Sequence, residues 1–295
     1  MASALKSFFR KALRTYLTYT PIKKGRYPLM MLVQKYTSEP VTLKVKTKDR
    51  GTMLLDVDDM AQIPLYYNIY EWRDTPTIIS LAQDTTTIVD IGGNIGQMAM
   101  LFAQYAKKVY TFEPIPATAN RLEQNIGLNG LNEKVILSRV ALTNYKGKIK
   151  FGLPPKSNRG TGSTVITEQS KNNTIEVESV TLDEFIERNN ITDVDLIKMD
   201  IEGAELFALR GMTKLLSTSN KPILILEMTL VMMKQAGYGA DELIDFLKGF
   251  GYICHEFTKN GLKRSLSEVH PQSENYCFLS SEHLLLQKVK RVLVT

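Results

Sequence analysis

The chain contains few cysteines and few histidines. Its 295 residues include two cysteines, Cys254 and Cys277, and three histidines. The cysteines do not have a metal-ligand spacing, which argues against a zinc site and against a disulfide-stapled scaffold. We interpret both as buried thiols in a reducing compartment, which favours a cytoplasmic location.

Long hydrophobic runs, internal repeats and low-complexity segments are also missing. The longest apolar candidate, "PILILEM", is interrupted by Glu227, and it is much shorter than the roughly 18 residues of a membrane span. A hydrophobic content of 43% over this length predicts one large α/β domain with an N-terminal extension, or two small domains.

Acidic residues are absent from the first 36 positions. This stretch carries eight lysines and arginines, so the rest of a chain with formal charge +6 sums to −2. The body of the protein is therefore not basic, and a nucleic-acid partner is disfavoured.

The same stretch predicts an amphipathic helix. Its apolar residues recur at helical spacing: Leu5, Phe8, Phe9, Ala12, Leu13, Tyr16 and Leu17. Lys6, Arg10 and Arg14 line another face. Three interpretations remain open: a helix packed on the domain with solvated charges, a peripheral membrane contact through residues 1–20, and a cleaved transit peptide.

Strand and helix patterns alternate after a hairpin. Residues 41–57 predict a β-hairpin and residues 60–83 a helix. We predict strands at 87–91, 108–112, 134–138, 195–199, 223–227, 251–257 and 275–280. We predict helices at 95–106, 116–128, 181–189, 203–216 and 240–249. The alternation favours a mostly parallel sheet covered on both faces. The loop-like sequence "KNGLKRSLSEVHPQ" before the final strand suits an antiparallel last strand.

A glycine-rich turn follows the first strand of this series. "TIVDIGGNIGQ" places Asp90, Gly92, Asn94 and Gly96 at alternate positions. Glycines allow the backbone to approach a ligand closely. The dinucleotide fingerprint G-x-G-x-x-G fails twice here, which disfavours an NAD oxidoreductase.

The next strand ends in "VYTFEP". Glu113 then lies at the carboxyl end of the neighbouring strand, where it can accept hydrogen bonds from both hydroxyls of a ribose. Pro114 turns the chain away from the sheet. Together with the glycine turn, Glu113 predicts an adenosine ligand without a diphosphate.

With these motifs the sequence resembles the FkbM family of S-adenosylmethionine-dependent methyltransferases. The resemblance rests on "YEWRDT", "VDIGGNIG", "FEP" with "LNGL", "VTLDEF" with "DLIKMDIEGAE", and "ILILEM", and it covers roughly residues 41–257. It implies a Rossmann-like seven-stranded methyltransferase sheet with an antiparallel last strand. It also implies methyl transfer to oxygen, often on sugars, polyketides or glycolipids.

The resemblance also implies a division of the chain and further cofactor contacts. We predict a basic amphipathic extension over 1–36, a hairpin and helix subdomain over 37–84, and the methyltransferase domain over 85–295. Glu71 and Thr75 are expected near the methionine part of the cofactor, and Ala141 near its adenine. Gly93 stands where the family commonly has alanine, which predicts a looser turn.

The strand order implied by the family brings acidic residues together. Asp200 ends one strand and Glu227 ends its neighbour, at the edge where open α/β sheets bind ligands. We predict Asp200, Glu202 and Glu227 as catalytic residues, with Asp200 also near the cofactor. Two such carboxylates can raise one another's pKa and act as a base. As a minority alternative, Asp200 and Glu227 hold a divalent cation.

A structural role remains open for part of this motif. Asp200 or Glu202 could cap the helix that begins near 203, and Glu205 suits its first turn. Lys198, inside an apolar strand, is expected to pair with a carboxylate.

The leading interpretation is an O-methyltransferase for a glycan or other small hydroxylated acceptor. The alternatives are an RNA or protein methyltransferase, and a cofactor-binding scaffold without activity. The acceptor and the oligomeric state do not follow from the sequence.

Overall fold

The main sheet explains where the glycine turn and the acidic residues lie. The computed structural model describes residues 3–20, 24–70, 73–153, 162–166, 170–265 and 274–294. Within these residues the main sheet has eight strands in the order β12-β11-β13-β10-β9-β3-β4-β5. The bounds are β3 Thr87–Ile91, β4 Lys108–Phe112, β5 Val135–Ser138, β9 Leu196–Met199, β10 Ile223–Met228, β11 Ile253–Thr258, β12 Gly261–Arg264 and β13 Glu274–Leu279.

The predicted topology is confirmed in its central part. Strands β10, β9, β3, β4 and β5 are parallel, and β13 is antiparallel to both β10 and β11. The strand β12 is an addition to the predicted seven, because Thr258 to Gly261 closes a hairpin where we expected a loop.

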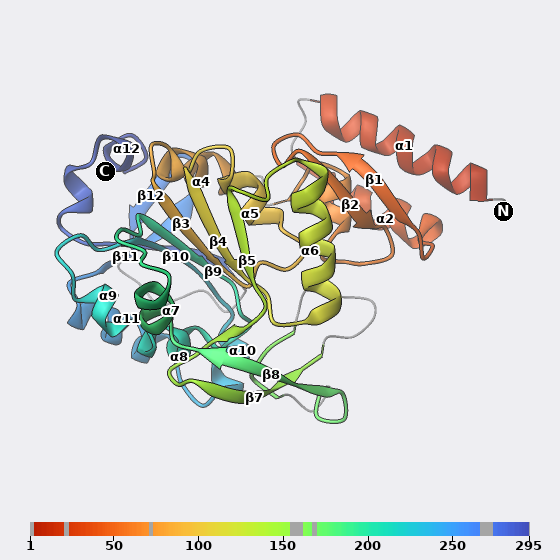
Figure 1. The fold of residues 1–295 in the computed structure, drawn as a ribbon. Helices are drawn as coiled ribbons and strands as arrows, with labels where there is room; N and C mark the ends of the chain where they lie inside the picture. Colours follow the sequence, from red (N-terminus) through yellow and green to blue (C-terminus); the bar gives the residue numbers. More distant parts are fainter. Residues whose placement is uncertain are drawn as a thin grey trace.

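Helices cover both faces of the sheet (Figure 1). Helices α7 Leu182–Arg188, α8 Glu205–Arg210, α9 Thr213–Leu216 and α11 Ala240–Gly249 enclose one hydrophobic core. Helices α4 Thr75–Ala82, α5 Gln97–Phe102 and α6 Pro116–Leu128 enclose the other. Short helices α10 Leu230–Gln235 and α12 Gln287–Lys290 and the 3-10 turn His283–Leu285 complete the domain.

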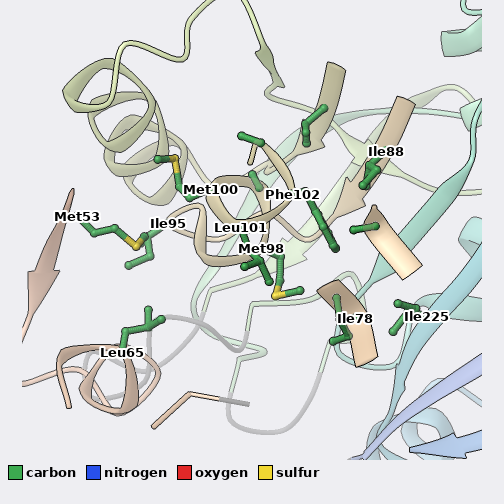
Figure 2. Close-up of a cluster of buried hydrophobic side chains, with 14 of the residues drawn as sticks. Met53, Leu65, Ile78, Ile88, Ile95, Met98, Met100, Leu101, Phe102 and Ile225 are labelled. Atoms are coloured by element: carbon green, nitrogen blue, oxygen red, sulfur yellow. The ribbon is translucent and has the colours of Figure 1, made fainter. Parts of the chain in front are cut away.

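Helix α5 lies at the centre of the second core. All six of its residues are buried, since it follows the glycine turn directly into the space between the sheet and α4. Figure 2 shows Met98 and Phe102 of α5 among Ile78 of α4, Ile88 of β3 and Ile225 of β10. This packing fixes the turn that precedes the helix.

The N-terminal region joins this same core. Helices α1 Ser3–Tyr19 and α2 Arg26–Thr37 pack with the hairpin of β1 Thr42–Lys46 and β2 Thr52–Asp56. The hairpin is confirmed. The single helix predicted over 60–83 is wrong: α3 Ile63–Tyr66 and α4 are separate, and Asn68 between them has a left-handed backbone with φ +56°.

Two further differences concern local structure. A second sheet of β6 Ala141–Leu142, β7 Gly147–Gly152 and β8 Thr174–Val180 was not predicted. The helix predicted over 203–216 divides into α8 and α9. Gly211 separates them, packed so closely on Thr143 that a Cβ there would lie 2.1 Å from the Thr143 carbonyl oxygen.

Candidate active site

The glycine turn passes between the ends of β4 and β9. Gly92 has φ +88°, and a Cβ at this position would lie 1.9 Å from the backbone oxygen of Asp200. The amides of Gly92 and Gly93 donate to the Phe112 carbonyl over 3.1 and 2.9 Å. Only glycine therefore fits at 92, both for its backbone angle and for the space available.

Glu113 is held in place by the backbone around it. Its Oε2 accepts from the Asn94 amide over 3.0 Å and its Oε1 from the Ile115 amide over 2.8 Å. Burial raises the pKa of Glu113 to about 8, although both hydrogen bonds act in the opposite direction. Each carboxylate oxygen has a second acceptor position. The fixed carboxylate can therefore still accept hydrogen bonds from the hydroxyls of a sugar.

A pocket opens at the carboxyl ends of β3, β4 and β9. It is lined by Ile91, Gly92, Asn94, Phe112, Glu113, Pro114, Ile115, Val140, Ala141, Leu142, Phe151, Gly162, Thr164, Asp200, Ile201 and Ala204. The structure thus brings together six predicted cofactor residues: Gly92, Asn94, Glu113, Pro114, Ala141 and Asp200. Its free space is about 40 Å³, so lining side chains must separate to admit a nucleoside.

The other predicted cofactor residues lie elsewhere. Asp90 is buried beneath the turn, where Thr111 Oγ1 donates to its Oδ2 over 3.1 Å. Gly96 precedes α5 with φ +98° and shapes the turn. Thr75 lines a different hollow together with Arg50. The structure does not bring Thr75 into the pocket, and Glu71 lies outside the described residues.

Asp200 and Glu227 lie side by side as the strand order predicts. The Asp200 amide donates to the Ile91 carbonyl over 2.9 Å, which fixes Asp200 beside the glycine turn. Leu226 of β10 is opposite Met199 of β9, so the next pair along the two strands is Glu227 and Asp200. Asp200 is therefore shared between the pocket and an acidic cluster.

Lys198 places a positive charge inside this cluster. Its side chain is 1% exposed, and its Nζ lies 3.9 Å from Glu227 Oε2. The predicted pairing of Lys198 with a carboxylate is confirmed. A buried ammonium beside two carboxylates limits their mutual repulsion without removing it.

The pKa values of the acids are raised. Burial, and next the charge of Glu227, raise the pKa of Asp200 well above its usual range, while Lys198 opposes the shift. Burial and the charge of Glu227 also raise the pKa of Glu202 to about 7. A carboxylate with a pKa nearer neutrality is a better acceptor for the proton of a hydroxyl group.

Glu205 has a structural role, as one interpretation predicted. Its Oε1 accepts from the amides of Ile201 and Gly203, both over 3.2 Å, and Tyr238 donates its hydroxyl to Oε2 over 3.2 Å. These bonds close the turn that carries Glu202, whose φ is +52°.

The capping alternative for Asp200 and Glu202 is wrong. Helix α8 begins after Ala204, and no side chain caps it. Glu202 instead has a left-handed, strained backbone within the turn. Ser163 also holds this turn, because the Ser163 hydroxyl donates to the carbonyls of Ile201 and Glu202 over 3.1 and 2.9 Å.

Two residues of the cluster were missed from the sequence. Asp74 precedes α4, and its Oδ2 accepts from Asn275 Nδ2 over 3.0 Å. Asn275 is the partner of Glu227 in the pairing of β10 with β13. Burial raises the pKa of Asp74, and Lys198 and Glu227 both act on it. The signal was present, since Asp74 stands inside the "YEWRDT" segment that carries Glu71 and Thr75.

The donor set does not fit a divalent cation. Among the residues that the structure describes, no three His, Cys, Asp or Glu side chains are grouped so that they could hold a metal ion. The Lys198 ammonium stands next to Glu227, one of the two oxygen ligands that the minority alternative requires.

The sequence matches the model of a known family. The family is described as "Methyltransferase FkbM domain", and the match covers residues 90–254, which is more than half of the chain. This stretch contains the glycine turn, Glu113 and the acids of β9 and β10.

Curated relatives match over about half of the chain. Hexuronic acid methyltransferase AglP of Haloferax volcanii is 32% identical over 158 residues, which is 52% of this chain and 63% of the relative. The 2-O-methyltransferase NoeI of Sinorhizobium fredii is 30% identical over 152 residues, 45% of this chain and 60% of the relative. The matches thus span less than two thirds of each relative.

Among solved structures, the crystal structure of Methyltransferase FkbM from Methylobacillus flagellatus has a TM-score of 0.44 and 14% identity. That comparison covers 86% of this chain and 58% of the other chain.

Proposed function

This chain belongs to the FkbM family of methyltransferases, and from this premise we propose that it is an S-adenosylmethionine-dependent O-methyltransferase acting on a hydroxyl of a carbohydrate or another small hydroxylated acceptor. One observation carries the proposal. Asp200 lines the pocket at the carboxyl ends of β3, β4 and β9 and also belongs to the cluster of acids with raised pKa values. Cofactor binding and proton transfer would therefore meet at one residue.

The chain's own residues fit the cofactor. Gly92 leaves the backbone bare where a side chain would fill the turn, and Glu113 is held by two amides with acceptor positions to spare for the ribose. Ala141 contributes a small side chain to the pocket wall. When bound, S-adenosylmethionine supplies an activated methyl group.

The acids would take the proton of the acceptor hydroxyl. An alcohol gains nucleophilicity as it loses its proton, and a positioned base contributes about 10²–10⁴-fold to the rate. Asp200 is the candidate base, because it alone of the three predicted catalytic acids lines the pocket. Glu227 raises the pKa of Asp200, and Lys198 lowers it. Asn275 and Asp74 complete the cluster on the other side of Glu227.

The names of the relatives support a carbohydrate acceptor. One is a hexuronic acid methyltransferase and another a 2-O-methyltransferase. Each match spans only about half of this chain and less than two thirds of the relative, so the acceptor of this chain stays a proposal.

A screen of acceptors tests the proposal. The purified protein would be incubated with methyl-labelled S-adenosylmethionine and separate pools of glycans, lipids, RNA and other proteins, and the labelled product identified. We expect label in a glycan or small hydroxylated compound, as an ether that resists mild base. Label in RNA or protein alone, or tight cofactor binding with no label in any pool, would contradict it.

A further inference from the structure

Helix α1 turns aromatic side chains toward solvent. Along its 17 residues an exposed stripe consists of Leu5, Phe8, Phe9, Tyr16 and Tyr19. Phe8 is 63% exposed and Tyr19 82%. Of the seven apolar residues named in the sequence pattern of this helix, only Leu13 and Leu17 are buried.

Arg10 and Arg14 of α1 turn the other way and hold the helix in this orientation. Arg10 is 2% exposed, donates to the Thr37 carbonyl and forms an ion pair with Glu39. Arg14 donates through Nε to the Tyr66 carbonyl over 2.7 Å. Rotating the stripe inward would break these bonds and expose Leu17, so the outward aromatic face is a fixed feature.

Exposed apolar side chains are concentrated in this region. Among the described residues, fourteen large hydrophobic side chains are exposed, and eight of them fall within residues 5–36. Figure 1 shows α1 at the end of the molecule opposite the C-terminus. A cluster of exposed aromatic residues on one helical hairpin marks an interaction surface rather than scattered surface residues.

The positive charge of the N-terminal region favours one class of partner. Lys11, Lys24 and Lys35 are exposed, and residues 1–36 contain no acid. The inward Arg14 donates to backbone carbonyls, which carry no net charge, so its positive charge persists. Two copies joined through this face would bring like charges together, which disfavours a dimer.

We propose that the α1 stripe binds an anionic lipid bilayer. Phenylalanine and leucine side chains would enter the boundary between headgroups and acyl chains, with the tyrosine hydroxyls at the level of the headgroups. The exposed lysines would add electrostatic attraction to the anionic headgroups. Such binding would hold the enzyme at a membrane whatever its acceptor is, so it does not rest on the proposed reaction. In the described part of the chain no helix has the length and hydropathy needed to span a membrane.

Vesicle binding tests the proposal. Full-length protein would be sedimented with phosphatidylcholine vesicles that contain about 30% phosphatidylglycerol, at roughly 0.1 M salt, and with phosphatidylcholine alone. We expect binding to the mixed vesicles only. The double variant Phe8→Ala/Phe9→Ala should bind at least about tenfold more weakly, because it lacks the two rings that would move from water into the bilayer.

A matched control removes two exposed apolar side chains at the far end. Leu285 and Leu286 are 72% and 41% exposed, and Leu285→Ala/Leu286→Ala should bind like the wild type. Lys11→Glu should weaken binding and reduce its salt dependence. Unchanged thermal unfolding verifies that each variant is folded.

Three results would overturn the proposal. The first is equal vesicle binding by the wild type and Phe8→Ala/Phe9→Ala. The second is a dimer in sedimentation velocity that this double variant abolishes, which would assign the stripe to a second copy. The third is salt-dependent RNA binding lost in the same variant without any vesicle binding.

Discussion

Asp200 is the residue at which cofactor and acid chemistry are expected to meet, and its substitution should separate the two. Asp200→Asn keeps the shape of the side chain but removes the proton acceptor. We expect kcat to fall about 10²–10⁴-fold, with S-adenosylmethionine affinity by calorimetry changed little. The contrasting variant Glu113→Ala, in the same pocket, should instead weaken cofactor binding, because it removes the carboxylate that would accept hydrogen bonds from the ribose hydroxyls. Normal turnover by Asp200→Asn would remove its catalytic role.

The raised pKa values predict a pH dependence with a definite sign. A general base acts in its ionised form, so kcat should be low in acid and increase as the pH passes through the raised pKa of Asp200. The increase should lie well above the usual range of an aspartate. Glu202→Gln should move the midpoint to lower pH and retain activity, because the charge of Glu202 raises the pKa of Asp200. A profile flat down to about pH 5 would contradict the assignment, and loss of activity in Glu202→Gln would transfer the role to Glu202.

At the scale of single residues, the sequence predicts site residues that lie at the carboxyl ends of strands. Asp200, Glu227 and Glu113 each lie at the carboxyl end of a strand, and parallel strands bring their carboxyl ends to one edge. Asp74 and Asn275 could not be found in this way. Their contact joins positions 201 residues apart, and the antiparallel pairing of β13 with β10 creates it.

At the scale of elements, the glycine turn makes the sharpest prediction. Gly92→Ala places a Cβ against the Asp200 carbonyl and imposes a left-handed backbone on alanine. We expect a loss of several kcal/mol in the free energy of unfolding, together with loss of cofactor binding.

Gly127→Ala in helix α6 is the matched control, since nothing lies within 4 Å of its Cβ. It should stabilise the protein by about 0.5–1 kcal/mol. Thermal unfolding with and without cofactor measures both, and cofactor binding by Gly92→Ala at wild-type affinity would refute our account of the turn.

Neighbouring Gly93 makes a contact with another strand that the glycine motif alone does not predict. We expected it to loosen the turn, but a Cβ there would lie 2.1 Å from Thr111 Oγ1. That hydroxyl donates to Asp90 beneath the turn. The glycine therefore leaves room for a hydrogen bond from another strand, which spacing along the chain does not reveal.

The second sheet shows the same limit for whole elements. Strand β7 ends at Gly152, and only the return of β8 at Thr174–Val180 provides its partner. The alternation of apolar and polar residues within β7 or β8 alone is too short to predict a sheet. The sheet becomes evident only when the two strands are seen paired. The main sheet was predictable because its strands are buried apolar runs separated by helices of ordinary length.

At the scale of the whole molecule, the N-terminal region is part of the core. Leu17 and Met30, in the extension that we predicted over residues 1–36, share one hydrophobic cluster with Met53 and Leu55 of the hairpin strand β2. Amphipathic periodicity indicated a helix but could not decide which of its faces is inside. The buried Arg10 settles that question through its bonds to Thr37 and Glu39.

Removal of residues 1–36 should therefore destabilise the protein. The deletion strips Leu13, Leu17 and Met30 from the shared cluster, and each buried aliphatic side chain lost costs about 2–5 kcal/mol. With roughly 2–4 °C per kcal/mol for a domain of this size, we expect the Tm to fall by more than about 10 °C. The substitution Phe8→Ala is the control, because that side chain belongs to α1 and yet is 63% exposed. A truncated protein with an unchanged Tm would show that the region is a dispensable extension, as a cleaved transit peptide requires, and that the packing of α1 contributes little to the stability of the enzyme.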